Sequence, residues 1–343
     1  MTSRAPRAGV ESSERGRPPA HRVRCALALV ALAGGVSRLL CAMSGQAAVF
    51  GGLAGCQDPP AAAPARLWLG GDLHLGTAGA PAVDRLAPLA AVTRGAFGIV
   101  NLEGPVADDG AVIARGRLGN GAGLVAGLAR AGVRVAGVAN NHAADRGADG
   151  AARTIRTLRA AGVLPAGGAA GPAVVDVRGT RVVVVQIDLG GGAPARLGAE
   201  LVAARRLGDL LVVTFHVTGP PSYLPPPALR TAVDQAVAAG ADVIAAHGSH
   251  ALGAVERRGG AVIAWGLGNL LFHCDCTDER DGALLLVDLD HGRVRAAAIV
   301  PIDAALDGGT AAPAAQPALI FELLASLRST PLERDGDRAW ILR

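Results

Sequence analysis

The chain has 343 residues, which is enough for one large domain or two small ones with a buried core. Half of the residues are apolar, and the regular runs of Val, Leu and Ala exclude an intrinsically disordered chain. The net charge is +4, but seven arginines and two glutamates lie in the first 40 residues, so the part from Cys56 onward is close to neutral and no nucleic acid is expected as a partner.

Residues 1–55 are predicted to be a leader. Two apolar stretches, 25–36 and 39–55, are separated by Arg38, and each is shorter than the roughly 20 residues that span a bilayer. A charged region, an apolar region and the small residues before Cys56 resemble a bacterial lipoprotein signal, in which this cysteine becomes the lipidated N-terminus. We expect an exported protein of the cell envelope, held at the membrane by a lipid anchor. The alternatives are an uncleaved signal anchor and a plain secretory leader.

A Pro- and Ala-rich linker over 56–65 precedes alternating apolar and amphipathic stretches, which predict an α/β domain over 66–303. Strands are predicted over 66–69, 97–102, 134–138, 173–177, 181–187, 210–216, 242–246, 261–266, 283–289 and 293–300. Helices are predicted over 81–94, 118–131, 148–161, 194–207 and 225–239. The late strands favour antiparallel pairing, so we expect two sheets packed face to face with helices outside. Residues 304–343 are expected to be a linker followed by a helix.

Cys274 and Cys276 are the only cysteines beyond the leader and Cys56. One residue separates them, so a disulfide between them would be strained. A metal role beside His273 is an alternative, but simple thiols are favoured, and no disulfide framework is expected.

Five predicted strands run directly into polar residues that can bind a metal. These residues are Asp72 and His74; Asn101 and Glu103; Asn140, Asn141, His142 and Asp145; His216; and His247 and His250. Asp72 and His74 are two positions apart, so both are expected to point the same way. Because α/β sheets place their sites at the carboxyl ends of strands, the five segments are expected to meet. Imidazole with carboxylate and amide oxygen suits Mn, Fe or Zn. One strand-end histidine alone would be better explained as structural.

The order of these residues is similar to that of metallophosphatases, and more closely the chain resembles the CapA family of capsule (poly-γ-glutamate) synthesis proteins. The matching stretches are 71–72, 101–104, 139–142 with Asp145 and Gly147, 246–250, and 265–272. The resemblance covers about residues 66–300. It implies a four-layer α-β-β-α sandwich of the metallophosphatase type.

The resemblance also implies a site for two divalent metal ions. The implied ligands are Asp72, His74 and His250 for the first ion, Glu103 as the bridge, and Asn141, His216 and His247 for the second. Two such ions activate a water molecule and hold the attacking and leaving oxygens. His142 is implied as an acid or anion-stabilising donor that Asp145 orients. Asn269 is either a site residue or the cap of a turn.

The chain departs from the family pattern at two places. Glu103 stands where phosphatases usually have an aspartate, and Val217-Thr218-Gly219 follows His216 where the family commonly has Trp-Gly and a nearby glutamate. Three arginines, Arg115, Arg117 and Arg146, could contact an anionic substrate, but we interpret them as solvated surface charges.

We expect an envelope-anchored, metal-dependent hydrolase of the phosphoesterase type, acting on an anionic polymer or a phosphorylated small substrate in capsule synthesis. One alternative is a non-catalytic lipoprotein that binds or anchors polymer on the same fold. Another is a general secreted metallophosphoesterase, since the fold alone does not determine the reaction.

Overall fold

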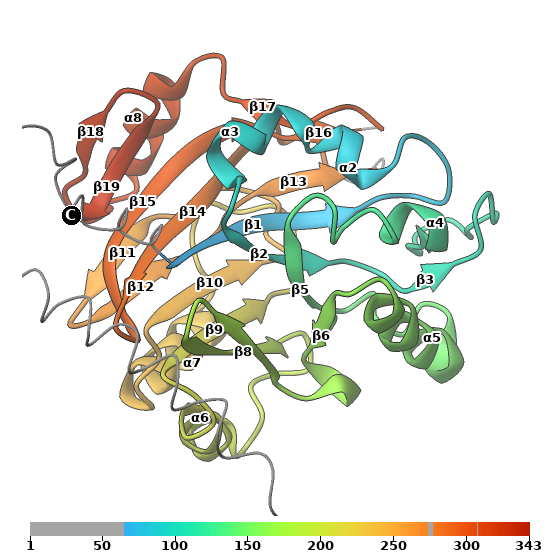
Figure 1. Ribbon diagram of the computed structural model, residues 1–343, viewed down its shortest axis with the longest axis horizontal. Helices are drawn as coiled ribbons and strands as arrows, with labels where there is room; N and C mark the ends of the chain where they lie inside the picture. The colour runs from blue at the N-terminus through green and yellow to red at the C-terminus, as the bar shows by residue number, and fades with distance from the viewer. Residues whose placement is uncertain (1–64, 274–276, 307) are drawn as a thin grey trace, which may run out of the picture. The chain divides into compact units, whose positions relative to one another are not determined.

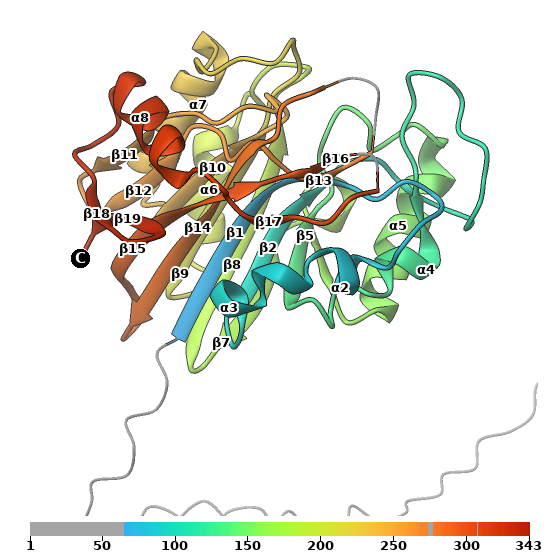
Figure 2. The same cartoon turned by 90° about the horizontal axis from the view of Figure 1, so that it is seen from above.

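Two β-sheets packed face to face lie at the centre of the computed structural model, which describes residues 65–273, 277–306 and 308–343 (Figures 1 and 2). The predicted leader, Cys56, Cys274 and Cys276 lie outside the described residues. Within the described part of the chain, no helix combines the length and the apolarity that crossing a bilayer requires.

The larger sheet has eleven strands, of which eight follow the order β18-β19-β15-β14-β1-β2-β5-β6. Its strands are β1 (Ala65–His74), β2 (Phe97–Leu102), β5 (Val133–Gly137), β6 (Leu164–Ala166), β13 (Asn269–Phe272), β14 (Asp281–Asp290), β15 (Arg293–Asp303), β16 (Ala305–Leu306), β17 (Ala312–Pro313), β18 (Glu333–Asp335) and β19 (Arg338–Leu342). Strands β1, β2, β5 and β6 are parallel, and β13 also runs parallel to β1. Strands β14 and β15 continue the sheet in antiparallel pairing.

The smaller sheet has six strands in the order β11-β12-β10-β9-β8-β7. Its strands are β7 (Ala173–Val177), β8 (Thr180–Asp188), β9 (Leu210–His216), β10 (Val243–His247), β11 (Val255–Arg258) and β12 (Ala261–Ala264). The four central strands β8, β9, β10 and β12 are parallel. A separate two-stranded ladder joins β3 (Val106–Ala107) to β4 (Asn120–Gly121).

Helices cover the outer faces of both sheets. They are α2 (Ala82–Arg85), η1 (Ala87–Leu89), α3 (Ala90–Thr93), α4 (Ala122–Val125) and α5 (Gly147–Ala160) on the larger sheet, α6 (Leu197–Arg205) and α7 (Pro227–Ala238) on the smaller one, with η2 (Gly168–Ala170) and α8 (Pro317–Ser326) elsewhere. One apolar cluster lies between the sheets, and it includes side chains of α8. A second cluster lies between the larger sheet and its helices, and a third between the smaller sheet and α6 and α7. The structure therefore confirms the predicted four-layer α-β-β-α sandwich.

An irregularity in β1 determines which way Asp72 faces. Leu69 packs in the core between the sheets, and the pairing of β1 with β2 shifts between Leu69 and Asp72. The extra residue changes the alternation of the strand, so Asp72 also faces the space between the sheets. Gly71 lies at this point, and a Cβ atom there would lie 2.0 Å from the carbonyl oxygen of Gly268. Only glycine permits this close approach.

Two predicted helices differ from the structure. The helix expected over 118–131 is reduced to the single turn α4, because the segment is rich in glycine and Asn120 bonds to neighbouring backbone groups. The helix expected over 81–94 is divided into α2, η1 and α3 near Pro88, which lacks an N–H for a continuous helix. Residues 304–343 contribute the expected helix as α8 and four short strands that the sequence did not suggest.

Candidate metal centre

The ends of parallel strands from both sheets meet at one edge of the inner core. In the larger sheet, β1 and β2 place Asp72 beside Asn101. In the smaller sheet, β9 and β10 place His216 beside His247. On β2, β9 and β10 these residues lie an even number of positions after a core residue, so strand alternation turns them into the space between the sheets.

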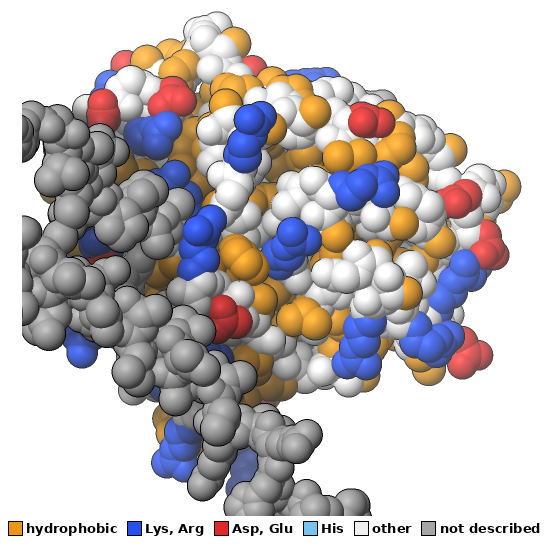
Figure 3. All heavy atoms as spheres, viewed as in Figure 1, with side chains coloured by type: hydrophobic (Ala, Val, Ile, Leu, Met, Phe, Trp, Pro, Cys, Tyr) orange, Lys and Arg blue, Asp and Glu red, His pale blue; other side chains and the backbone are white. Residues whose placement is uncertain are grey.

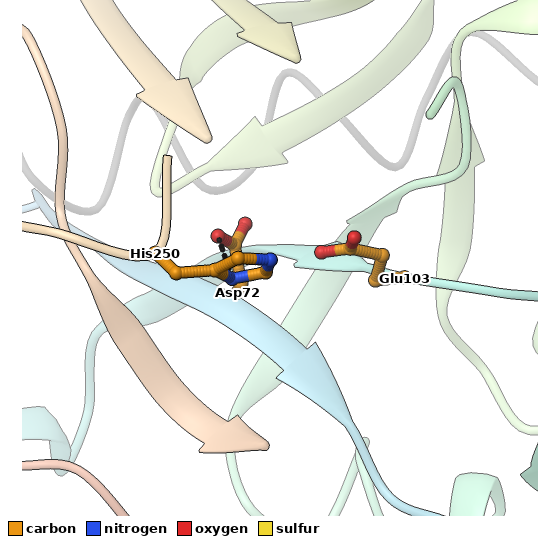
Figure 4. Close-up of side chains that lie close together, drawn as sticks. All are labelled: Asp72, Glu103 and His250. Atoms are coloured by element: carbon orange, nitrogen blue, oxygen red, sulfur yellow. Dashed lines mark ion pairs between the residues drawn. The ribbon is translucent and has the colours of Figure 1, made fainter. Parts of the chain in front are cut away.

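Three side chains converge most closely at this edge: Asp72, Glu103 and His250. Their ligand atoms all lie within 4.8 Å of one another, and both carboxylates belong to residues that are only 1% exposed. Figure 4 shows the His250 ring beside both carboxylates, with one ring nitrogen paired to Asp72. Two buried carboxylates so close together require a compensating positive charge.

Asp72 is held from four directions. Its Oδ1 accepts a hydrogen bond from Asn101 Nδ2 at 2.9 Å, and its Oδ2 accepts one from the backbone N–H of Gly248 at 2.9 Å. Nδ1 of His250 lies 3.2 Å from Oδ2, and Nδ1 of His247 lies 3.5 Å from Oδ1. Burial raises the pKa of the Asp72 carboxyl, but the two histidines outweigh this effect and lower it well below its usual value.

His216 lies between two carboxylates. Its Nε2 is 3.6 Å from Glu103 Oε1, and its Nδ1 is 3.7 Å from Asp188 Oδ1. Burial disfavours a charged imidazole, yet Asp188 and Glu103 outweigh burial and raise the pKa of His216 to about 10. In the absence of a metal, a proton on His216 therefore compensates these carboxylates, and a metal ion must displace it.

Asn269 orients His250. The His250 Nδ1 lies 3.0 Å from Asn269 Oδ1, while Asn269 Nδ2 donates to the carbonyl oxygen of Glu279. The His250 ring also packs against Phe272, with ring centroids 4.6 Å apart. The backbone of His250 has a φ of +53°, an unfavourable conformation for a residue with a side chain, and the asparagine contact helps to maintain it. Burial opposes the charge on His250, but Asp72 raises its pKa to about 9.

His142 and Asp145 form a pair at the rim of the site. The His142 Nδ1 lies 2.8 Å from Asp145 Oδ2, which also accepts a hydrogen bond from the backbone N–H of Leu118. The His142 side chain is 24% exposed, so it can reach a bound molecule. When Nδ1 carries the hydrogen toward Asp145, Nε2 is available to give or take a proton.

Two of the predicted ligands, His74 and Asn141, differ from the convergent group in their surroundings. His74 is two residues beyond Asp72, about 7 Å further along the strand, and its Nε2 lies 3.1 Å from the carbonyl oxygen of Gly119. Burial lowers the pKa of His74 to about 4. The side chain of Asn141 is exposed, whereas its neighbour Asn140 is buried.

A buried network of amide side chains holds Asn101 against Asp72. Asn101 Oδ1 accepts hydrogen bonds from Gln186 Nε2 at 2.8 Å and from Asn140 Nδ2 at 3.2 Å, and Asn101 Nδ2 then faces Asp72. Gln186 also accepts a hydrogen bond from Thr214. The sequence reasoning did not identify Gln186 or Asp188, although each is a polar residue at an inward position of an otherwise apolar strand, a signal that could have revealed them.

The donor set fits a divalent cation. Three buried nitrogen atoms lack a hydrogen-bond partner among the described residues: both ring nitrogens of His216 and Nδ1 of His247. Buried polar atoms without partners are costly, and these nitrogens lie beside the carboxylates of Asp72 and Glu103. Imidazole nitrogen and carboxylate oxygen are the ligands that Mn, Fe and Zn share. The residues therefore form a possible metal-binding cluster.

Comparison with known proteins identifies the family. The profile of the family described as "Bacterial capsule synthesis protein PGA_cap" matches residues 67–274, which is more than half of the chain. The chain belongs to this family. The PGA_cap match extends from β1 to the end of β13 and contains every residue of the cluster, so the predicted CapA resemblance is confirmed.

Two solved structures are similar over most of the chain. A phosphatase from Mycoplasma pneumoniae is 15% identical with a TM-score of 0.47, and the match covers 71% of this chain and 95% of that one. A hypothetical protein from Thermus thermophilus is 14% identical with a TM-score of 0.47, covering 70% and 99%. No curated protein sequence matches the chain. Neither structural similarity identifies a substrate or a reaction for this PGA_cap member.

Proposed function

We propose that the protein is a metal-dependent hydrolase of the phosphoesterase type that acts on an anionic polymer or a phosphorylated substrate during capsule synthesis. The observation that carries the proposal is the convergence of Asp72, Glu103 and His250, whose ligand atoms lie within 4.8 Å of one another at the meeting point of both sheets. Poly-γ-glutamate is the polymer type that the CapA resemblance implies.

Two divalent ions would find donors here. Asp72, His247 and His250 would hold one and His216 would contribute to the other, with Glu103 available to either. His247, predicted for the second ion, is thus assigned to the first. A bound pair would supply Lewis-acid chemistry and a nucleophile at neutral pH. His74 is left out of this ligand set because its Nε2 faces Gly119, and Asn141 stays a predicted ligand.

The rim residues supply the proton chemistry. His142 would protonate the leaving oxygen through Nε2, and Asp145 would hold the ring in the required tautomer through Nδ1. Asp145 is thus a positioning residue, because it acts through His142. The buried network of Asn101, Asn140 and Gln186 would keep the Asp72 carboxylate in place when the substrate binds.

Metal analysis with a phosphoester panel tests the proposal. The purified protein is expected to bind up to two equivalents of Mn, Fe or Zn and to hydrolyse phosphomonoesters or phosphodiesters in a manner that a chelator abolishes and added metal restores. Metal binding without turnover of phosphoesters or of poly-γ-glutamate would favour the alternative of a non-catalytic, polymer-binding protein. The departure from the family pattern after His216 is the reason for considering that alternative. Absence of metal binding would contradict both the metal centre and the proposed reaction.

Replacing His142 by Ala is expected to lower kcat about a hundredfold or more, the usual contribution of a positioned acid, while the bound metal is retained. Asp145→Asn is also expected to lower kcat and to alter its pH profile, because the ring remains but its tautomer is no longer held. The matched control is His291→Ala, since the His291 side chain is 94% exposed in the β14–β15 turn. Equal activity of His142→Ala and the control would exclude the proposed role.

The envelope location is also our proposal, and it rests on the sequence before Cys56. Cys56→Ser is expected to move the protein from the membrane fraction to the soluble fraction of the producing bacterium, because the acylated residue is lost. Fractionation followed by immunoblotting checks this result, with Cys41→Ser as the matched control. Membrane retention of the Cys56→Ser variant would contradict the lipid anchor.

A further inference from the structure

A cavity of about 790 Å³ opens at His74, two residues beyond Asp72, and is not used by the proposed chemistry. We call it the arginine cavity. Its wall includes Arg115, Arg117, His74 and His273, and no carboxylate among the described residues contributes to it. The loop that carries the arginines joins β3 to β4 and projects from the body of the fold (Figure 2). The two guanidinium groups in its wall attract an anion.

His74 provides a second observation that points to a ligand. It is 5% exposed, and its Nδ1 has no hydrogen-bond partner among the described residues. The backbone N–H of Gly119 lies 3.3 Å from Nε2. Whichever ring nitrogen carries the hydrogen, Nδ1 lacks a partner. A polar group of a ligand in the arginine cavity would supply one.

Two residues in the wall of the arginine cavity contact Asp145, the residue that positions His142. Arg117 donates from Nη1 to the carbonyl oxygen of Asp145 at 2.6 Å, and the next residue, Leu118, donates its backbone N–H to Asp145 Oδ2 at 2.7 Å. Gly119 then contacts His74. One short segment therefore links the cavity to the residue that orients His142.

Arginines also line a second cavity of about 530 Å³ without a carboxylate among its described lining residues, but none of those residues belongs to the site. On the face shown in Figure 3, arginines are scattered among apolar and acidic side chains and do not form one large basic patch. The part of that face that is not covered in grey shows no continuous basic track for a polyanion.

We infer that the arginine cavity binds an anionic group of a repeating substrate, a carboxylate or a phosphate, at a position beyond the bond on which the metal centre acts. This inference rests on the proposed function, and it gives the site a preference for a polyanionic chain over a single small ester. Arg115 and Arg117 are thereby assigned to substrate binding instead of to the solvated surface.

Fluorescence anisotropy with two labelled probes tests the inference on the full-length chain, without metal and without turnover. The probes are a poly-γ-glutamate decamer and a polyphosphate of similar length, which distinguish carboxylate from phosphate as the bound group. Arg115→Glu is expected to raise the Kd of the preferred probe about tenfold, because a charge-assisted contact is replaced by a repulsive one. Arg117 is not chosen, because its guanidinium also supports Asp145.

Two further variants make the result decisive. Arg156→Glu changes the net charge equally on the exposed face of α5 and is expected to alter the Kd less than twofold. Ala114→Trp fills the cavity without changing the charge and is expected to weaken the probe as strongly as Arg115→Glu. Binding of neither probe, or equal effects of Arg115→Glu and Arg156→Glu, would overturn the inference. Loss of chelator-sensitive turnover without loss of probe binding would refute only the proposed reaction.

Discussion

Replacing Asp72 by Asn is expected to abolish metal binding and to lower any metal-dependent activity by about a thousandfold or more. The reason is that a metal centre stabilises the transition state by several kcal/mol. The substitution keeps the size of the side chain but removes the negative charge that faces His247 and His250. It also places an amide N–H₂ against either Asn101 Nδ2 or the Gly248 N–H, both of which are donors. One buried donor then lacks an acceptor, at a cost of about 1–3 kcal/mol.

Thermal unfolding with and without metal separates the two effects. At a metal concentration of about 100 times Kd, the wild-type protein is expected to gain about 2.7 kcal/mol, which raises its Tm. The Asp72→Asn variant is expected to have a lower Tm than the wild type and to show no increase when metal is added. Asp290→Asn, at the exposed end of β14, is the matched control and should respond to metal as the wild type does. An Asp72→Asn protein that still gained stability from metal would contradict the proposed ligand set.

The second large effect is expected for Gly248→Ala, which should lower the free energy of unfolding by about 2–5 kcal/mol. Gly248 has a φ of +84°, in the left-handed region that residues with a side chain rarely adopt. A Cβ atom there would lie 2.2 Å from the carbonyl oxygen of Val217 and 2.6 Å from His216 Nε2. The turn must therefore move, and with it the backbone N–H that bonds Asp72.

Urea unfolding checks this prediction, and metal titration shows whether the displaced turn also weakens the site. The matched control is Gly260→Ala in the turn between β11 and β12, where an added Cβ would meet nothing within 4 Å and φ is not positive. This control is expected to be neutral or slightly stabilising, because alanine restricts the unfolded chain. Equal stability of the two variants would show that the conformation of Gly248 is not required.

Several parts of the fold were predictable because strand alternation and the length of an apolar run are local properties. The strand predicted over 97–102 coincides with β2, and the one over 210–216 with β9, since each is a short apolar run with a clear end. The helix predicted over 118–131 was wrong. The prediction followed the apolar periodicity of the segment, but its four glycines disfavour a helix, and the backbone at Asn120 forms strand β4 instead.

The position of Asp72 shows what a sequence pattern leaves open. Its place at the end of a predicted strand was correct, but the side that it faces depends on the irregularity between Leu69 and Asp72. A bulge of this kind reverses the alternation, and it arises from pairing with β2 and from the close approach of Gly268 to Gly71. These partners are distant in sequence, so no local pattern contains them.

The sequence by itself determined the family, the layered α/β class and the strand ends from which metal-competent residues emerge, because parallel strands bring their carboxyl ends to one edge. Only the tertiary structure decided which of those residues converge. It joined Asp72, Glu103 and His250, added Gln186 and Asp188 from β8, and turned His74 toward Gly119 and the arginine cavity. The physical reason is that side-chain direction at a strand end depends on neighbouring strands and on the loop that covers it, and both come from remote parts of the chain.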